Sequence, residues 1–188
     1  MLLRLHLRGC LAALKASGMP IVRQFSAGEW HTYRELRLRS LAKSPDAFGR
    51  TLAEEAVRSD VEWAERLASG CQSETDLPLV AEVDGRPIGL AWGRFPDSSE
   101  RDRVYLFQMW VDPDFRCLGA GSALLEAVAK WAADLGALYL VLGVTCETPA
   151  MRLYEKLGFE PVGEPTPLRP GSSLLGQRMQ LRLRGRAV

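Results

Sequence analysis

The stretch from Tyr105 to Leu125 constrains the fold of this chain more than any other segment. Residues 104–111 are an aromatic and aliphatic run of the kind that fits a pleated, half-buried strand, and Asp112-Pro113-Asp114 is turn chemistry that ends it. After Gly119 the apolar residues recur at helical spacing, at Leu124, Val128, Trp131 and Leu135. The segment therefore predicts a strand, a short loop with glycines and a helix.

Such a junction can bind an anion. Gly119 and Gly121 stand where the chain enters the helix, whose first N–H groups lack an intrahelical partner and whose dipole favours negative charge. Glycine lets the backbone approach a pyrophosphate closely. The sequence contains neither GxGxxG nor GxxxxGK[ST] here, so the Rossmann and P-loop types of phosphate site are not indicated. From this pattern alone, an ordinary strand-to-helix turn stays an alternative.

A second pattern follows downstream. Residues 138–144 are typical of a buried strand, and Thr148-Pro149 supplies an N-cap residue with proline at the first helical position. The short helix predicted over residues 150–157 ends at Gly158, the usual residue of a left-handed C-terminal cap. The strand, turn and short helix therefore follow the anion-binding junction in direct succession.

The two patterns resemble the signatures of one family. Arg116-x-x-Gly119-x-Gly121 resembles the acetyl-CoA pyrophosphate signature of the GNAT N-acetyltransferase superfamily, and residues 150–159 are similar to its second signature, AxxLYxKxGF. Both occur in the family order, and the resemblance extends over about residues 21–183. It implies an α/β fold with a mixed, mainly antiparallel sheet, splayed central strands and flanking helices, in a single N-acetyltransferase domain over residues 19–188.

The resemblance also implies a reaction, the direct transfer of an acetyl group from acetyl-CoA to a primary amine in a ternary complex. The acceptor could be a small molecule or a protein N-terminus. By the same resemblance, Tyr154 protonates the leaving thiolate. The cofactor would contact Met109, Trp110 and Val111 through its pantetheine, and Arg116, Cys117, Leu118, Gly119, Ala120, Gly121 and Ser122 through its pyrophosphate. A non-catalytic acyl-CoA-binding module is the alternative, and it would not need Tyr154.

The base that activates the amine stays open. Tyr105, Gln108, Glu82, Glu147 and a bound water are candidates. Glu147 stands where the family commonly has an asparagine that contacts the cofactor, and it could face the amine instead. Cys117 likewise replaces a common glycine of the pyrophosphate loop. The segments around Phe48 and residues 165–173 are expected to border the acceptor cleft.

The cysteines and histidines do not indicate a metal site. Cys10, Cys71, Cys117 and Cys146 are scattered without a CxxC pair, and His6 and His31 are distant from them in the sequence, so we expect neither zinc nor a disulfide framework. This usage suits the cytoplasm. No acid or histidine is patterned to activate a cysteine, which favours direct transfer over an acetyl-cysteine intermediate.

Charge is unevenly distributed. Of the 24 lysines and arginines, eight lie in residues 1–18 and 169–188, which hold no acid, so residues 19–168 carry 16 basic against 23 acidic groups. That excess would suit a cationic amine, although it could serve only solubility. We expect residues 1–18 to be a basic extension outside the folded domain, which could be disordered. No membrane span is indicated, nucleic acid is not an expected partner, and a homodimer is left open.

The remaining segments complete the prediction. A strand is expected at residues 21–25 and a hairpin turn at Asp84-Gly85. Helices are expected at residues 26–42, in a region that begins at about residue 51, and at residues 59–70, where Gly70 would end the helix. The proline-rich stretch after Phe159 is expected to be a long loop, followed by a final half-exposed strand at about residues 179–183.

Overall fold

A seven-stranded mixed sheet forms the centre of the computed structural model, which describes residues 18–96 and 102–183. The spatial order is β1-β2-β3-β4-β5-β7-β6, and the β4–β5 pair is parallel whereas the other pairs are antiparallel. The strands are β1 (Ile21–Gln24), β2 (Asp76–Val83), β3 (Arg86–Arg94), β4 (Arg103–Val111), β5 (Tyr139–Thr145), β6 (Glu160–Pro167) and β7 (Leu175–Arg182). The α/β fold with a mainly antiparallel sheet is thus confirmed, whereas the prediction for residues 1–18 concerns a segment that, except for Gly18, lies outside the described residues.

Side chains cap the first turns of three helices, and one of them is the predicted N-cap Thr148. The Thr51, Ser59 and Thr148 side chains each accept a hydrogen bond from a backbone N–H in the first turn of the following helix. The helical elements are η1 (Ala27–Glu29), α2 (Trp30–Lys43), η2 (Pro45–Ala47), α3 (Leu52–Ala56), α4 (Asp60–Gln72), η3 (Pro113–Phe115), α5 (Ala120–Asp134) and α6 (Pro149–Lys156).

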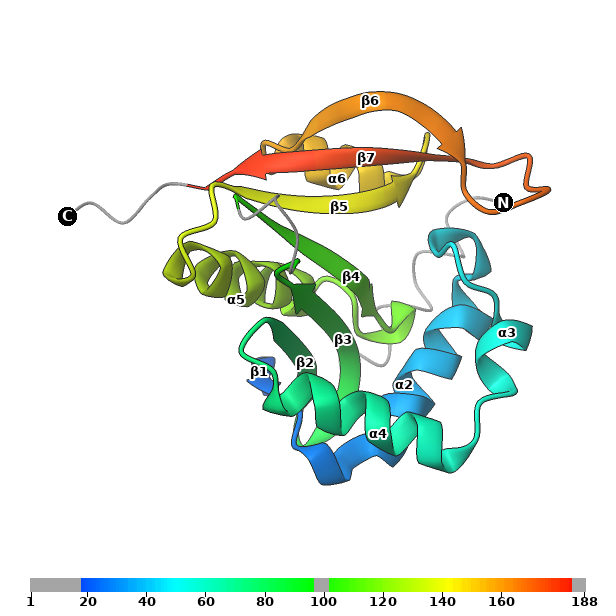
Figure 1. Cartoon of the computed structure of the whole chain (residues 1–188), viewed down its shortest axis with the longest axis vertical. Helices are drawn as coiled ribbons and strands as arrows, with labels where there is room; N and C mark the ends of the chain where they lie inside the picture. Colours follow the sequence, from blue (N-terminus) through cyan, green and yellow to red (C-terminus); the bar gives the residue numbers. More distant parts are fainter. Residues whose placement is uncertain (1–17, 97–101, 184–188) are drawn as a thin grey trace.

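Helices cover both faces of the sheet (Figure 1). Successive residues of a strand point to opposite faces, so β2 contributes Ala81 to a core with Leu124 of α5 and Val80 to a second core with Trp63 of α4. Helix α2 adds Tyr33 to the second core, and α6 packs on the α5 side. The two cores hold β4 between them.

The sheet opens between β4 and β5. Their parallel pairing joins Arg103–Leu106 to Tyr139–Leu142, and the two strands then separate (Figure 1). Just past this point the β3–β4 register shifts, and Gln108 has a positive φ of 54°. This confirms the predicted splay of the central strands, which leaves residues 107–111 of β4 without a strand partner on the β5 side.

The hairpin between β2 and β3 is confirmed. Asp84 and Gly85 both have positive φ, 51° and 74°, as a two-residue turn with the twist of the flanking strands requires. The left-handed cap at Gly158 is also present, with a φ of 88°.

The prediction of a long loop after Phe159 is wrong. Residues 160–167 form β6, which pairs antiparallel with β7 at the edge of the sheet. Pro161, Pro165 and Pro167 lie in this strand, and an edge strand tolerates residues that cannot donate to a ladder. Strand β7 also begins at Leu175, earlier than expected, so the connecting loop is only residues 168–174.

The prediction that Gly70 ends its helix is also wrong. Helix α4 continues to Gln72, and Gly70 is a buried residue within it. A Cβ atom added at Gly70 would overlap the indole ring of Trp92. The glycine is therefore explained by close packing against β3 and not by a helix end.

Candidate active site

A cleft of about 1640 Å³ follows the opening between β4 and β5. Strand β4 forms one wall through residues 105–111, and β5 with α6 forms the facing wall. The start of α5 lines one end, whereas η2 and α3 line the other. Most of the residues predicted for the site, together with Phe48 and part of the 165–173 segment, thus lie around a single cavity.

The loop before α5 has the geometry of a phosphate site. Gly119 is the N-cap of α5 with a φ of 88°, and no side chain caps the helix. A Cβ atom added at Gly119 would meet nothing within 4 Å, so the space in front of the helix is free of protein atoms. Cys117 and Gly121 also line the cleft, and Cys117 has a positive φ of 67°, which suits the glycine common in the family. The backbone N–H groups here fit an anion such as a pyrophosphate.

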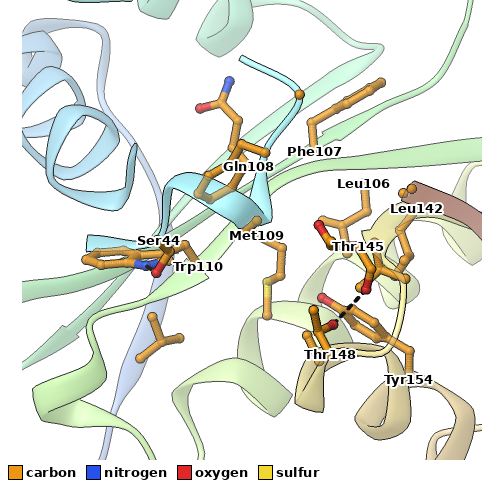
Figure 2. A pocket seen from close by; sticks show the side chains of 18 of the residues that line it. Ser44, Leu106, Phe107, Gln108, Met109, Trp110, Leu142, Thr145, Thr148 and Tyr154 are labelled. Atoms are coloured by element: carbon orange, nitrogen blue, oxygen red, sulfur yellow. Dashed lines mark hydrogen bonds between the residues drawn. The ribbon is translucent and has the colours of Figure 1, made fainter. Parts of the chain in front are cut away.

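The open edge of β4 lines the middle of the cleft. Met109 presents its side chain to it, whereas Trp110 is 4% exposed and its Nε1 donates to Ser44 Oγ at 3.1 Å (Figure 2). Only the backbone of Trp110 is therefore suited to a ligand. Leu118 lies beside the core and not in the cleft lining.

Tyr154 lies on the facing wall. It is carried by α6, and its ring packs edge-on against Phe159 with the centroids 5.4 Å apart. Burial raises the pKa of the Tyr154 phenol to about 12, so the hydroxyl keeps its proton at neutral pH. Figure 2 shows Tyr154 and Met109 on facing sides of the cleft, with Gln108 at the far end.

The candidate bases separate into two groups. Tyr105 and Gln108 line the cleft, and Gln108 Oε1 accepts a hydrogen bond from Tyr33 Oη at 3.1 Å. Glu82 is outside the cleft lining, in an ion pair with Arg23 at 2.7 Å. Glu147 is exposed, also outside the lining, and has a φ of 60°. Because asparagine adopts this conformation more readily than glutamate, the backbone explains the residue common in the family at this position.

Sequence reasoning missed a cluster of charged residues at the η2–α3 end. Arg37, Glu55, Arg58 and Arg66 line the cleft together. One signal was present, because Arg37 is spaced by four residues from Tyr33 and from the buried Leu41, and so belongs to the core-facing stripe of α2.

The charge of the cleft is opposite to that expected. Eight lysines and arginines line it against two carboxylates, Asp46 and Glu55. The acid excess of residues 19–168 is therefore spread elsewhere, and the suggestion that it suits a cationic amine is not supported by the cleft itself.

Within residues 18–96 and 102–183 no three potential metal-ligating side chains gather, and none of the helices has the length and apolar character of a membrane span. Cys71, Cys117 and Cys146 are free thiols, and Cys117, in the loop before α5, is exposed.

Comparison with known proteins supports an acyltransferase site. Residues 71–159 match the model of the Acetyltransferase (GNAT) family. An uncharacterized N-acetyltransferase of Methanocaldococcus jannaschii is 33% identical over 88 residues, 44% of this chain and 38% of the relative. The ribosomal protein bS18-alanine N-acetyltransferase of Salmonella typhimurium is 35% identical over 98 residues, 52% of this chain and 64% of the relative.

The fold is shared with solved structures. A putative acetyltransferase from Salmonella typhimurium, solved with its cofactor acetyl-CoA, superimposes with a TM-score of 0.69 and 23% identity, covering 90% of this chain and 97% of that chain. The chain spans between about a third and two thirds of the length of the curated relatives it matches.

Proposed function

We propose that this chain, whose residues 71–159 match the model of the GNAT family of acetyltransferases, transfers an acetyl group from acetyl-CoA to a primary amine. The observation that carries the proposal is Tyr154, a phenol that stays protonated at neutral pH and faces the open edge of β4. A proton donor in this place suits the departure of a thiolate, which a binding module would not need.

The backbone of the chain holds the acetyl donor. The unpaired edge of β4 at Met109, Trp110 and Val111 is suited to the amides of the pantetheine arm, as in strand addition. The N–H groups around Gly119 are suited to the pyrophosphate, and the Arg116 guanidinium lies at the same end of the cleft. With the donor held in this way, the thioester would lie between β4 and α6.

The transfer itself needs one bond formed and one broken. The acceptor nitrogen forms a bond to the acetyl carbonyl carbon, the carbon–sulfur bond breaks, and Tyr154 Oη gives its proton to the sulfur. The amine proton passes to water held near Tyr105 and Gln108, which both line the cleft and can orient that water by hydrogen bonds. Glu82 and Glu147 lie outside the lining and are not needed for this step. No cysteine takes part.

The acceptor and the compartment belong to the proposal as well. The relative from Salmonella typhimurium is named for the alanine of a ribosomal protein, which supports a protein N-terminus as acceptor. The arginine-rich end of the cleft supports a small molecule. Three free cysteines are compatible with a reducing compartment such as the cytoplasm.

Tyr154→Phe tests the proposed role. The change keeps the ring on Phe159 and deletes the proton donor, so kcat should fall by about 10²-fold while the affinity for acetyl-CoA and the melting temperature change little. Activity is measured as free thiol release with a panel of amines. Tyr139→Phe on β5, outside the cleft lining, is the matched control and should keep full activity.

The same experiment separates the alternative function. A non-catalytic acyl-CoA-binding module would bind acetyl-CoA and release no thiol with any amine, in the parent protein as in the variant. An unchanged kcat in Tyr154→Phe, with the chemical step rate-limiting, would remove Tyr154 from the mechanism.

A further inference from the structure

Three arginines surround one buried carboxylate at the η2–α3 end of the cleft. Glu55 of α3 is 2% exposed, and Arg58 Nε donates to its Oε2 at 3.1 Å. Arg66 Nη1 of α4 lies 3.5 Å from the same oxygen. Arg37 Nη2 of α2 is 4.0 Å from Glu55 Oε1, beyond hydrogen-bonding distance. The group therefore carries an excess of two positive charges.

Arg37 is the least satisfied member of this cluster. Its side chain is 4% exposed, and within the described residues its Nε and Nη1 atoms have no hydrogen-bond partner. Its guanidinium lies over the ring of Phe48, 4.7 Å from the centroid, and a ring face accepts no strong hydrogen bond. Buried donors without acceptors are unfavourable, and an anion entering the cleft would supply the missing acceptors.

The cluster is separate from the place assigned to the pyrophosphate. Arg66 lies over the ring of Trp92, which is paired with Phe107 on β4, before the bulge at Gln108. The pyrophosphate loop follows the other end of β4, after Val111. An anion at the arginine cluster would thus belong to the second substrate and not to acetyl-CoA.

We propose that the acceptor is a small amine that also carries a carboxylate, and that Arg37, Arg58 and Arg66 bind that carboxylate while the amine reaches the thioester. This inference rests on the proposed acetyl transfer and specifies its substrate. A small acceptor is favoured because the side chains of Arg58 and Arg66 are only 30% and 33% exposed, so that a short group within the cleft suits their guanidinium groups, while the 4% exposed Arg37 adds its positive charge beside them. Guanidinium groups suit carboxylates because their donors match the two oxygens.

Matched pairs of acceptors test the proposal. Glycine and the common L-amino acids that have a primary amine are compared with their α-carboxamides, which keep the amine and the side chain but lose the negative charge of the α-carboxylate. Aminoalkylphosphonates form a second arm that distinguishes carboxylate from phosphonate. Transfer is read as thiol release and as acetylated product by mass spectrometry. We expect at least one amino acid to exceed its carboxamide about ten-fold or more in kcat/KM.

Arginine variants connect that preference to the cluster. Arg66→Gln should reduce kcat/KM for the amino acid about ten-fold and leave both the carboxamide rate and the acetyl-CoA affinity unchanged. Arg66 is chosen because its side chain is 33% exposed, so that the fold should survive the change. Arg34→Gln is the matched control, since Arg34 is an α2 arginine that pairs with Asp60 outside the cleft. It should leave both rates unaltered.

Three results would overturn the proposal. One is equal rates for acids and carboxamides, another is a preference for the polycation spermidine or for aminoalkylphosphonates, and the third is transfer to peptide N-termini alone. All three would leave acetyl transfer itself standing. If no amine is acetylated, the proposed function fails. The anion site is then tested separately by calorimetry, which measures binding of the amino acids to the parent and to Arg66→Gln in the presence of coenzyme A. Equal or absent binding would refute it.

Discussion

The residue type at some positions is explained by close contact with residues that are distant in the sequence. The indole ring of Trp92 packs directly against Gly70. Its Nε1 donates a hydrogen bond to Asp76 Oδ1 at 2.6 Å, which holds the ring in place. A residue without a side chain is needed because the ring cannot move away without breaking that bond. The glycine is therefore required by the close packing of α4 against β3 at this point.

Gly70→Ala should destabilise the protein. Alanine favours a helix by about 0.5–1 kcal/mol, but the overlap with Trp92 should cost about 1–3 kcal/mol, so the free energy of unfolding should fall by up to about 2.5 kcal/mol. Urea unfolding measures the difference. Gly28→Ala is the control, because a Cβ atom there meets nothing within 4 Å. A stabilised Gly70→Ala variant would show that the indole ring yields easily.

At the scale of elements, the two ends of α5 present the same backbone conformation to different surroundings. Gly119 precedes the helix with a φ of 88°, and Gly136 follows it with a φ of 82°. Neither would place an added Cβ atom within 4 Å of other groups. Of these two glycines only Gly119 lines the cleft. The same substitution at both positions therefore separates an effect on backbone conformation from an effect on ligand binding.

Gly119→Asp should abolish the stabilisation of the protein by acetyl-CoA. Ligand that binds the folded state raises the melting temperature by mass action, and a carboxylate at Gly119 would repel the pyrophosphate at the helix N-terminus. Gly136→Asp should retain the full melting shift. If acetyl-CoA stabilised both variants as strongly as the parent, the loop before α5 would not be its phosphate site.

At the scale of the whole molecule, one ion-pair group ties the first strand to the rest. The Arg23 guanidinium of β1 binds Glu29 of η1 and Glu82 of β2, each at 2.7 Å. The hydrogen bond from Arg23 lowers the pKa of the Glu29 carboxyl from 4.5 to about 2, and the backbone N–H of Ser26 also contributes. The stability of the folded protein should therefore depend on pH through this ion-pair group.

Glu29→Gln should remove that dependence. A carboxyl whose pKa is lower in the folded state stabilises the protein above its unfolded value near 4.5, and this contribution is lost as the pH falls toward 2. The parent should therefore be more stable than Glu29→Gln above about pH 5, and the two should converge near pH 2. Chemical unfolding across this range measures the difference. Glu126→Gln, at an exposed position of α5, should show no such convergence.

Local patterns were readable from the sequence because the residues that make them are neighbours in the chain. The N-cap at Thr148, the Asp84-Gly85 hairpin and the junction at Gly119 each follow from a few adjacent residues, and the structure confirms them. The two signatures likewise predicted the family and the fold. The roles of Tyr154, Tyr105 and the pyrophosphate loop stay predictions for the variants above.

Only the tertiary structure decided what depends on distant segments. The insertion of β7 between β5 and β6 makes β6 an edge strand, so that its prolines are tolerated where a loop was predicted. Contacts between distant segments also place Glu82 outside the cleft and bring Arg37, Glu55 and Arg66 together from three helices. Burial and charge at these positions are set by long-range contacts, which no local pattern of residue types contains.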